Sequence, residues 1–393
     1  MCRKGIKRTS ITRISFLLIF SLLLTSCWNN RDLVEINIVV GLGLDRTEEG
    51  KVLLTIQVVE PAAIQSTSSG KGKGGGTQAK PVFIESYEGE TVFDAVRGML
   101  SIVDKRLFLS TAQVLILGER LSRDGIEELL DFFQRNHKID YGMVVLVAKD
   151  ATPREILEIE TDMETIPAIY IKETVENTVL RGTVKKTLLI DLIKDMGGIG
   201  RQPAIGQISK AGEKKVITES TAVFRDGRLV GWLDPYEPRG YLFATNKLKS
   251  AIVNIPANEG KISMEIIKSK GKVSVAFENG EPSMLTVKVE TQANVGGYEG
   301  KGTLDSPDNL FILEKTLEEE VKKEIMMALE KTQKEYLSDI FGFGSYVHKY
   351  HPQYWKNAEE DWNDIFSKLP ADIQVDAQIL RTGIIKSPLK KDE

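Results

Sequence analysis

The N-terminal segment constrains this chain more than any other feature, because it predicts where the mature protein begins. Residues 1–13 carry five basic side chains and no acidic one, and residues 14–24 form an apolar run too short to span a bilayer. Leu24-Thr25-Ser26-Cys27 follows this run. Small residues before such a cysteine are typical of a lipoprotein signal. We therefore expect a signal peptide over 1–26 and a diacylglyceryl group on Cys27. An ordinary secretory signal with a chance cysteine is the alternative.

The cysteine content limits how the mature chain can be stabilised. The 393-residue chain has two cysteines: Cys2 lies in the predicted signal peptide, and Cys27 is predicted to carry lipid. No disulfide can then form within the mature chain, so the burial of apolar side chains must stabilise it. A hydrophobic fraction of 41% is ordinary for globular domains, and the length is enough for more than one core. A net charge of −4 gives no indication of nucleic-acid binding.

Apolar periodicity predicts mixed strands and helices in the first half of the chain. The expected strands are 36–44, 51–59, 82–87, 113–117 and 141–148. The expected helices are 91–102, one that begins at Asp124 with Glu127 in a capping box, 153–157, and the second part of 172–196. Residues 61–81 are rich in glycine, serine and lysine, and this composition predicts a surface loop.

The second half is predicted to be richer in strands. Asp226-Gly227 lies between two apolar runs and predicts a type I′ hairpin over 221–233. Further strands are expected at 251–255, 261–268, 272–277, 284–291 and 373–379, with helices at 309–336 and 353–369. Trp355 and Trp362 fall on one face of the last helix. We expect both helices to pack on a sheet formed by the hairpin and the strand 373–379.

These elements predict an α+β fold with several domains, in which mixed sheets are flanked by helices. After removal of the signal peptide at 1–26, residues 27–35 are expected to form a lipidated tether. Residues 36–200 would then form an N-terminal α+β region and residues 216–388 a C-terminal α+β domain, with 201–215 as the linker between them.

Motifs for catalysis, cofactor binding and metal binding are incomplete. Gly41-Leu42-Gly43 follows a predicted strand, but Arg46 stands where a dinucleotide fingerprint has its third glycine, and residues 70–77 lack the phosphate-loop pattern. His348 and His351 have no third metal ligand at a clear spacing. No pair of carboxylates stands out for acid–base work. We therefore expect no enzyme activity, no cofactor and no metal.

Several aromatic and cationic side chains have a structural interpretation. Trp232, Trp355 and Trp362 could line an aromatic ligand pocket. They recur with other apolar residues at strand or helix spacing, however, and this favours core packing. His137 follows a predicted helix and is expected to act as a cation at the C-terminus of that helix.

Four blocks, in order along the chain, resemble the Ger(x)C family of spore germination lipoproteins, which are the C subunits of nutrient germinant receptors. The first block runs from Cys27-Trp28 to a strand that ends in Gly-x-Gly-x-Asp at Asp45. The last contains Asp-Ile-x-Gly-Phe-Gly at 339–344 and a proline–tryptophan pattern in which His351 directly precedes Pro352. The four blocks are 27–45, 112–136, 221–243 and 332–366.

The resemblance implies a protein anchored by lipid on the outer leaflet of the spore inner membrane, beside two integral subunits, A and B. Together these subunits would respond to small nutrients, and the C subunit would act in assembly or signalling without catalysis. The resemblance also implies three α+β domains, in which case the N-terminal region would divide near Gly182.

A lipid-anchored extracytoplasmic protein that binds solutes or acts on the cell wall is the alternative function. Solute-binding proteins usually have two long doubly wound lobes, which the strand-rich C-terminal half does not predict. A wall hydrolase needs a carboxylate pair or a metal set, and neither is recognisable. The sequence leaves open which nutrient is sensed, whether this subunit binds it, and which surface contacts the partners.

Overall fold

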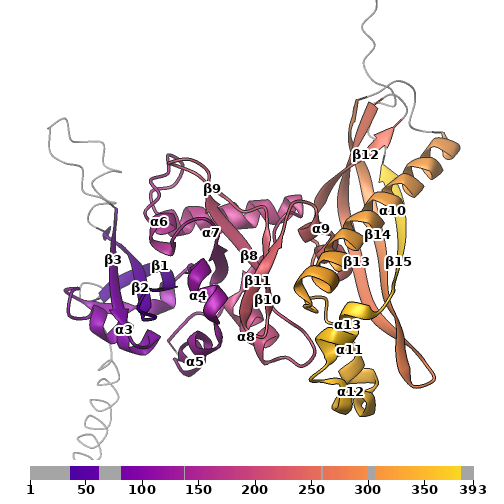
Figure 1. Ribbon diagram of the computed structural model, residues 1–393. Coiled ribbons are helices and arrows are strands. Elements are labelled where there is room, and N and C mark those ends of the chain that lie inside the picture. The colour runs from indigo at the N-terminus through magenta and orange to yellow at the C-terminus, as the bar shows by residue number, and fades with distance from the viewer. Residues whose placement is uncertain (1–35, 62–80, 137, 258–259, 300–305, 382–393) are drawn as a thin grey trace, which may run out of the picture.

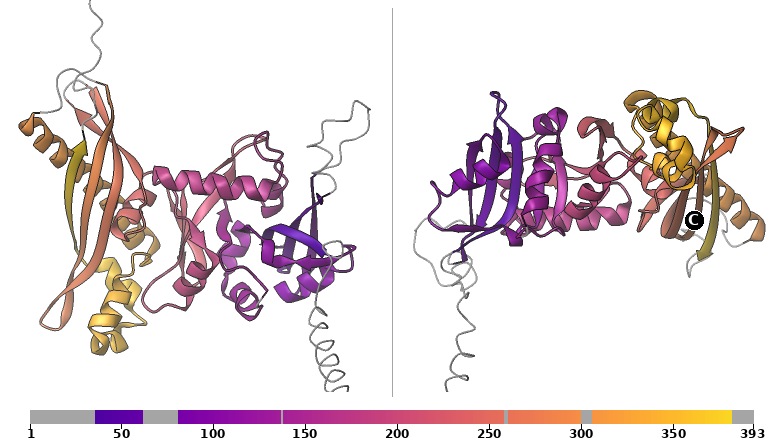
Figure 2. Two further views of the ribbon diagram at one scale, coloured as in Figure 1. Left: turned by 180° about the vertical axis from the view of Figure 1, so that it is seen from behind. Right: turned by 90° about the horizontal axis from the view of Figure 1, so that it is seen from below.

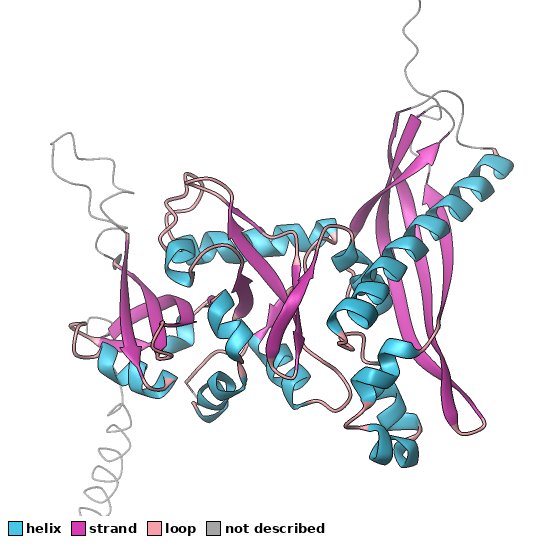
Figure 3. Ribbon diagram, viewed as in Figure 1, coloured by secondary structure: helices cyan, strands magenta, loops and turns pink. Residues whose placement is uncertain are grey.

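The computed structural model describes residues 36–61, 81–136, 138–257, 260–299 and 306–381. The predicted signal peptide, Cys27, the tether, His137 and most of the predicted loop at 61–81 lie outside these residues. The described chain forms two sheets with helices packed against them (Figure 1 and Figure 3). The predicted α+β class is therefore confirmed.

Eleven strands form the first sheet, in which the order β11-β10-β8-β6-β5-β1-β2-β3 runs from edge to edge. β1 pairs antiparallel with β2 and parallel with β5, and the β10–β11 hairpin forms one edge. β4, β7 and β9 pair beside this path. The strands are β1 (Ile36–Arg46), β2 (Val52–Val59), β3 (Val82–Gly89), β4 (Arg106–Phe108), β5 (Val114–Leu117), β6 (Val144–Ala148), β7 (Thr187–Leu188), β8 (Ala204–Lys210), β9 (Val216–Ile217), β10 (Thr221–Arg225) and β11 (Arg228–Leu233).

Helices cover both faces of the first sheet. One face is covered by α3 (Val92–Met99), α4 (Glu119–Asp124), α5 (Glu127–Arg135) and α8 (Leu189–Gly197), which bury Met99, Leu121 and Phe133. The other face is covered by α6 (Pro153–Leu157) and α7 (Pro167–Thr178), which bury Ile156 and Ile171. Each fully buried side chain of this size stabilises the fold by about 1.5–3 kcal/mol relative to an exposed one.

The second sheet has four strands, β12 (Ala251–Ala257), β13 (Gly260–Glu278), β14 (Glu281–Glu299) and β15 (Ala371–Arg381). β13 and β14 form a long hairpin, and β15 runs parallel to β14. The helix α10 (Pro307–Glu330) lies along this sheet and buries Leu317, Val321 and Ile325 (Figure 2). α10 continues into the π-helical turn η5 (Lys331–Tyr336). The smaller helices are α9 (Glu237–Ala244), α11 (Phe343–Tyr350), α12 (Pro352–Ala358) and α13 (Trp362–Lys368).

One apolar cluster joins the two sheets. It contains Ala204, Val223 and Leu233 from the first sheet, together with the inner residues of the second sheet and of α10. The two sheets therefore share a buried core. Among the described residues, no helix combines the length and the apolar character needed to cross a membrane.

The structure corrects the predicted domain boundaries. Residues 204–210 form β8, which pairs with β6 and β10, so the predicted linker at 201–215 is wrong. The predicted domain at 216–388 also gives its first strands to the first sheet. The sheet shows no break near Gly182, because β7 and β8 beyond it both pair with β6. A third domain stays a prediction.

The predicted packing of the C-terminal helices is also wrong in one respect. The hairpin at 221–233 belongs to the first sheet and β15 to the second, so they do not form one sheet. Residues 359–361 divide the predicted helix at 353–369 into α12 and α13, although Trp355 and Trp362 are both buried as expected. The strands predicted at 261–268 and 272–277 are one continuous strand, β13.

The capping box predicted at Asp124 is wrong, because Asp124 ends α4 instead of beginning a helix. The helix α4 packs on the core through the buried side chain of Leu121. An ion pair of 2.6 Å between Arg123 and Glu119 spans one turn of the helix. α5 then begins at Glu127 without a side-chain cap.

Candidate functional site at the junction of the two sheets

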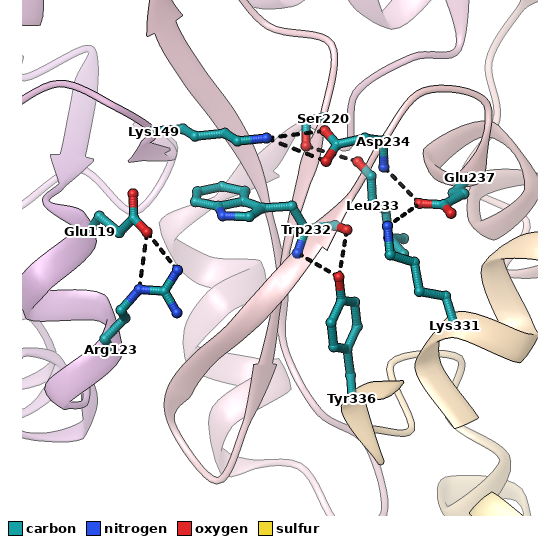
Figure 4. A network of polar contacts seen from close by, with 10 residues as sticks. All are labelled: Glu119, Arg123, Lys149, Ser220, Trp232, Leu233, Asp234, Glu237, Lys331 and Tyr336. Carbon is teal, nitrogen blue, oxygen red and sulfur yellow. Dashed lines mark hydrogen bonds and ion pairs between the residues drawn. The ribbon is translucent and has the colours of Figure 1, made fainter. Parts of the chain in front are cut away.

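We call the described residues of 36–233, with the first sheet and its helices, the first unit, and those of 234–381, with the second sheet and its helices, the second unit. A side chain from the second unit covers the edge strand of the first sheet. β11 is the last strand of the first sheet, so the outer main-chain groups of Trp232 have no neighbouring strand. The hydroxyl of Tyr336, in η5, accepts a hydrogen bond from the Trp232 N–H at 3.2 Å and donates one to the Trp232 carbonyl at 2.9 Å (Figure 4). Buried main-chain groups need such partners, so this contact connects the two units.

A chain of polar contacts continues from this point across the junction (Figure 4). Lys149, which follows β6, pairs with Asp234 at 3.3 Å and lies 5.2 Å from the centre of the Trp232 ring. Asp234 donates its main-chain N–H to Glu237, and Lys331 at the start of η5 pairs with the same carboxylate at 2.9 Å. Burial lowers the pKa of Lys331, but the hydrogen bond and charge of Glu237 outweigh it, so the pKa lies above its usual value.

Tyr236 stands out within this turn. Its φ of 75° lies in a region that residues other than glycine rarely adopt, and the residue is 54% exposed. Arg239 lies 5.4 Å from the centre of that ring, and the Glu237 carboxylate bonds back to Asp234. Strained conformations of this kind persist only where the surroundings impose them, and they cluster at functional sites.

A buried ion pair fastens α9 to α10. Arg239 and Glu324 are both almost fully buried, and two hydrogen bonds join the guanidinium to the carboxylate, one of them 2.7 Å long. Arg239 also donates to the Ile252 carbonyl of β12. Burial raises the pKa of Glu324 above its usual value, although the Arg239 guanidinium opposes this rise. Removal of either partner would leave a buried charge unpaired, which typically costs about 3–5 kcal/mol.

Asp339 organises the loop that carries the Gly-Phe-Gly sequence. Its buried carboxylate accepts hydrogen bonds from the main-chain N–H groups of Gly342, Phe343 and Gly344, and from the indole N–H of Trp362 at 2.9 Å. Burial raises the pKa of Asp339 above its usual value, and these four donors oppose the rise. The carboxylate is therefore a structural acceptor, enclosed by the groups that it orders.

This loop touches the first unit at a point where two glycines meet. The main-chain N–H of Ser345 donates to the Gly200 carbonyl at 2.7 Å, and the Ser345 hydroxyl donates to the Ile199 carbonyl at 2.7 Å. Gly200 has a φ of 68°, and a Cβ added there would collide with the main chain of Gly344. Two backbones therefore approach as closely as glycine allows.

The first unit presents a buried charge cluster beside this contact. Lys185 is fully buried, pairs with Asp195 at 3.1 Å, and donates to the Ala204 carbonyl at 2.6 Å. Arg201 lies 3.9 Å from the same carboxylate and donates to the Phe341 carbonyl of the second unit. A cavity of about 400 Å³ lies between this cluster and the helices α12 and α13, and Trp355 and Glu359 are among its lining residues.

The arrangement can hold the two units in a fixed relation. Among the described residues, no group of three His, Cys, Asp or Glu side chains could hold a metal ion. His351 stacks on Phe277 with ring centres 3.7 Å apart, and His348 contacts the Trp355 ring, so neither imidazole faces a metal site.

The structure brings three of the residues that the sequence singled out to this junction. Trp232 lies in the edge strand, and Trp355 and Trp362 lie together with ring centres 5.5 Å apart. Sequence reasoning missed Lys185, Tyr336 and Asp339. Only Asp339 had a signal, because it opens the Asp-Ile-x-Gly-Phe-Gly pattern and stands three residues before Gly342. Cys27 lies outside the described residues, so its lipidation stays a prediction.

Comparisons with known proteins agree with this architecture. Two family profiles match in order: "Spore germination protein N-terminal domain" over residues 29–210, and "Spore germination B3/ GerAC like, C-terminal" over residues 219–383. In Bacillus subtilis (strain 168), spore germination protein KC is 26% identical, with 95% of this chain and 96% of that protein covered. Spore germination protein B3 from the same strain is 23% identical, with 95% and 98% covered.

A solved structure has a similar fold. The crystal structure of the GerBC protein superposes with a TM-score of 0.55 and 19% sequence identity, and the match covers 86% of this chain and 97% of that one. The fold described above is therefore shared over nearly the whole length of that protein.

Proposed function

The chain belongs to the Ger(x)C family of spore germination proteins, and we propose on this basis that it is a lipid-anchored, non-catalytic subunit of a nutrient germinant receptor. The observation that carries the proposal is the extent and order of the family matches, which cover residues 29–210 and 219–383. A protein that had borrowed a single domain from the family would match over one of these ranges alone.

The proposed anchor is Cys27. Cleavage after residue 26 would make this cysteine the first residue of the mature chain, on the outer leaflet of the spore inner membrane. Two acyl chains, each contributing about 0.8 kcal/mol per buried CH₂ group, would hold the protein there durably. The small residues Thr25 and Ser26 and the apolar run before them support this assignment.

The proposed partners are the integral A and B subunits. The role is assembly or signalling, for which a subunit of fixed shape is suited. The shared core and the bonds of Tyr336 and Ser345 across the junction favour such a shape. If a partner moved one unit, the other unit would then move with it as a rigid body.

Within this role, Tyr236 is the residue that we propose as a partner contact. Tyr236 is 54% exposed and its backbone is strained. Exposed aromatic side chains are enriched among the residues that dominate the binding energy of protein interfaces.

The anchor is tested by substitution of each cysteine in turn. Cys27→Ala should abolish labelling by a palmitate analogue and leave the chain unprocessed or secreted. Cys2→Ala is the matched control, because Cys2 lies in the predicted signal peptide, and it should leave labelling unchanged. Undiminished label in Cys27→Ala would exclude Cys27 as the anchor.

The partner assignment is tested by co-purification from spore membranes. The tagged chain should recover the A and B subunits, and Tyr236→Ala should reduce that recovery without a change in thermal stability. Tyr350→Ala is the control, because Tyr350 is 57% exposed, similar to Tyr236, and lies at the end of the ordinary helix α11. Equal recovery by both variants would exclude Tyr236 as a contact.

A further inference from the structure

Four large apolar side chains are exposed along one short segment of the first unit. Phe93 is 57% exposed, Leu100 39%, Ile102 50% and Phe108 38%. Phe93 lies on the outer face of α3, and Leu100, the residue that caps the C-terminus of α3, follows seven residues later on the same side, while Val92, Ala95 and Met99 face the core. Ile102 follows in the turn after the helix, and Phe108 lies in β4. We call these four residues the α3 patch.

The α3 patch borders the place where the described chain begins. β4 pairs in parallel with the first residues of β1, so that Arg106 lies opposite Ile36 and Phe108 opposite Ile38. The side chain of Asn37 donates to the Asp104 carboxylate and to the Lys105 carbonyl. The segment that carries the patch is therefore fixed against the N-terminal end of β1.

The distance from this end to the proposed anchor is limited by covalent geometry. Nine residue steps separate Cys27 from Ile36. Even a fully extended chain of this length reaches only about 30 Å, which is near the diameter of a small domain. A lipid on Cys27 would therefore hold the N-terminal end of β1, and the patch beside it, close to the bilayer surface.

The charged residues around the patch suit an interface with lipid headgroups. Arg97 lies on the same face of α3, 5.2 Å from the centre of the Phe93 ring, and Arg106 is exposed in β4. Guanidinium groups next to apolar side chains can bind lipid phosphates while the apolar groups enter the boundary with the acyl chains. Asp94 and Asp104 are also nearby, so the apolar groups carry more of the binding than the net charge does.

We propose that the α3 patch rests on the outer surface of the bilayer, as a second membrane contact beside the lipid. The inference rests on the proposed lipidation of Cys27, which brings the patch to the membrane. Such a contact would fix the orientation of the whole subunit relative to the membrane, because the two units share one core.

The test uses the full lipidated chain in vesicles of phosphatidylglycerol and phosphatidylethanolamine that contain a nitroxide-labelled lipid. Cys27 is blocked by lipid and Cys2 is removed with the signal peptide, so a single introduced cysteine can be labelled with a fluorophore. A label at Ile102→Cys should lose fluorescence to the nitroxide. A label at Phe311→Cys should not, because that residue is 60% exposed but lies on α10, at the other end of the molecule (Figure 1).

A second variant separates the patch from the anchor. Phe93→Glu with Leu100→Glu, in the chain labelled at position 102, should restore the fluorescence while the lipid still holds the chain on the vesicles. Circular dichroism should be unchanged, because both positions are exposed.

Failure of the two proposals can be told apart. An intact chain that is not retained on the vesicles would overturn the anchor and the patch together. A retained chain with an unquenched label at position 102 would overturn the patch alone. Shielding of that label only after addition of the A and B subunits would also overturn it, because the patch would then be a protein interface.

Discussion

Tyr336 and Trp232 lie 104 residues apart in the sequence, and one hydroxyl group of Tyr336 bonds both main-chain groups of Trp232. The tyrosine thereby occupies the place of a neighbouring strand at the edge of the first sheet. Edge strands with free N–H and C=O groups can pair with other chains, and covering the edge prevents this. The same contact holds the second unit against the first.

Tyr336→Phe should weaken the connection between the two units. Loss of the hydroxyl leaves the Trp232 N–H and carbonyl without partners, and each unsatisfied buried group costs about 1–3 kcal/mol. We expect the wild-type protein to unfold in urea in one transition. Tyr336→Phe should unfold at a lower urea concentration and in two transitions, one for each unit. Tyr350→Phe is the control, because its ring is largely exposed. A single transition with an unchanged midpoint in Tyr336→Phe would contradict the coupling.

Trp362 should contribute to stability in two separable ways. Trp362→Ala removes a large core side chain and should cost about 3–5 kcal/mol. Trp362→Phe keeps much of the apolar volume but removes the indole N–H that donates to Asp339, and should cost about 1–3 kcal/mol. Denaturant titration of both variants gives the two values. Full stability of Trp362→Ala together with loss of the partner subunits would show instead that the tryptophan is an interface residue.

Gly200→Ala should be more destabilising than its backbone conformation alone explains. Gly200 and Gly212 have similar positive φ angles, 68° and 79°, but an added Cβ meets the backbone of Gly344 in the first case and nothing within 4 Å in the second. Gly212→Ala should therefore cost about 1 kcal/mol, from strain alone. The difference between the two variants in lost stability, measured by thermal unfolding, gives the cost of displacing the loop at 342–345. Equal losses would show that the loop moves freely.

Glu155 should contribute to stability in a pH-dependent way. The N–H and hydroxyl of Thr152 donate to its carboxylate, and these bonds hold the pKa of Glu155 below its usual value of 4.5. Because the pKa of Glu155 is lower in the folded protein, its carboxylate becomes protonated at a higher pH in the unfolded chain than in the folded one. The contribution is therefore fully present above pH 4.5 and is lost as the pH falls through the lowered value.

Glu155→Gln removes this titration and keeps a side chain that can accept the same bonds. The difference in unfolding free energy between wild type and variant should be constant from pH 7 to pH 5 and should shrink below 4.5. A difference that stayed constant to pH 3 would show that the carboxylate is not stabilised by the cap.

Local patterns predicted the elements whose form depends on neighbouring residues. The β10–β11 hairpin has its turn at Asp226 and Gly227, and both have the positive φ that a type I′ turn requires. The alternation at 284–291 lies within β14, and the capped start of α3 at Thr91 agrees with the predicted helix.

Contacts between distant segments explain the failures. The gap left between the strands predicted at 261–268 and 272–277 contains Gly271, yet β13 continues through it. α9 approaches the strand closely here, and a Cβ at Gly271 would collide with the Phe243 carbonyl. Lys185 resembles a surface lysine in the sequence, and its burial depends on Asp195 and on the Ala204 carbonyl across the fold. No pattern within a few residues carries this information.

The placement of the β10–β11 hairpin has a consequence for exchanging parts between relatives. The C-terminal family profile begins at residue 219, before the hairpin, although the hairpin completes the first sheet. A chimaera joined at residues 211–218 would take Trp232 and Tyr336 from the same parent and keep them matched. A chimaera joined after Leu233 would take the whole first sheet from one parent. Its Trp232 would then face whichever residue the other parent has at position 336. The C-terminal family profile therefore does not begin where the second sheet begins. Because the profile includes the hairpin, Trp232 and Tyr336 both fall within it.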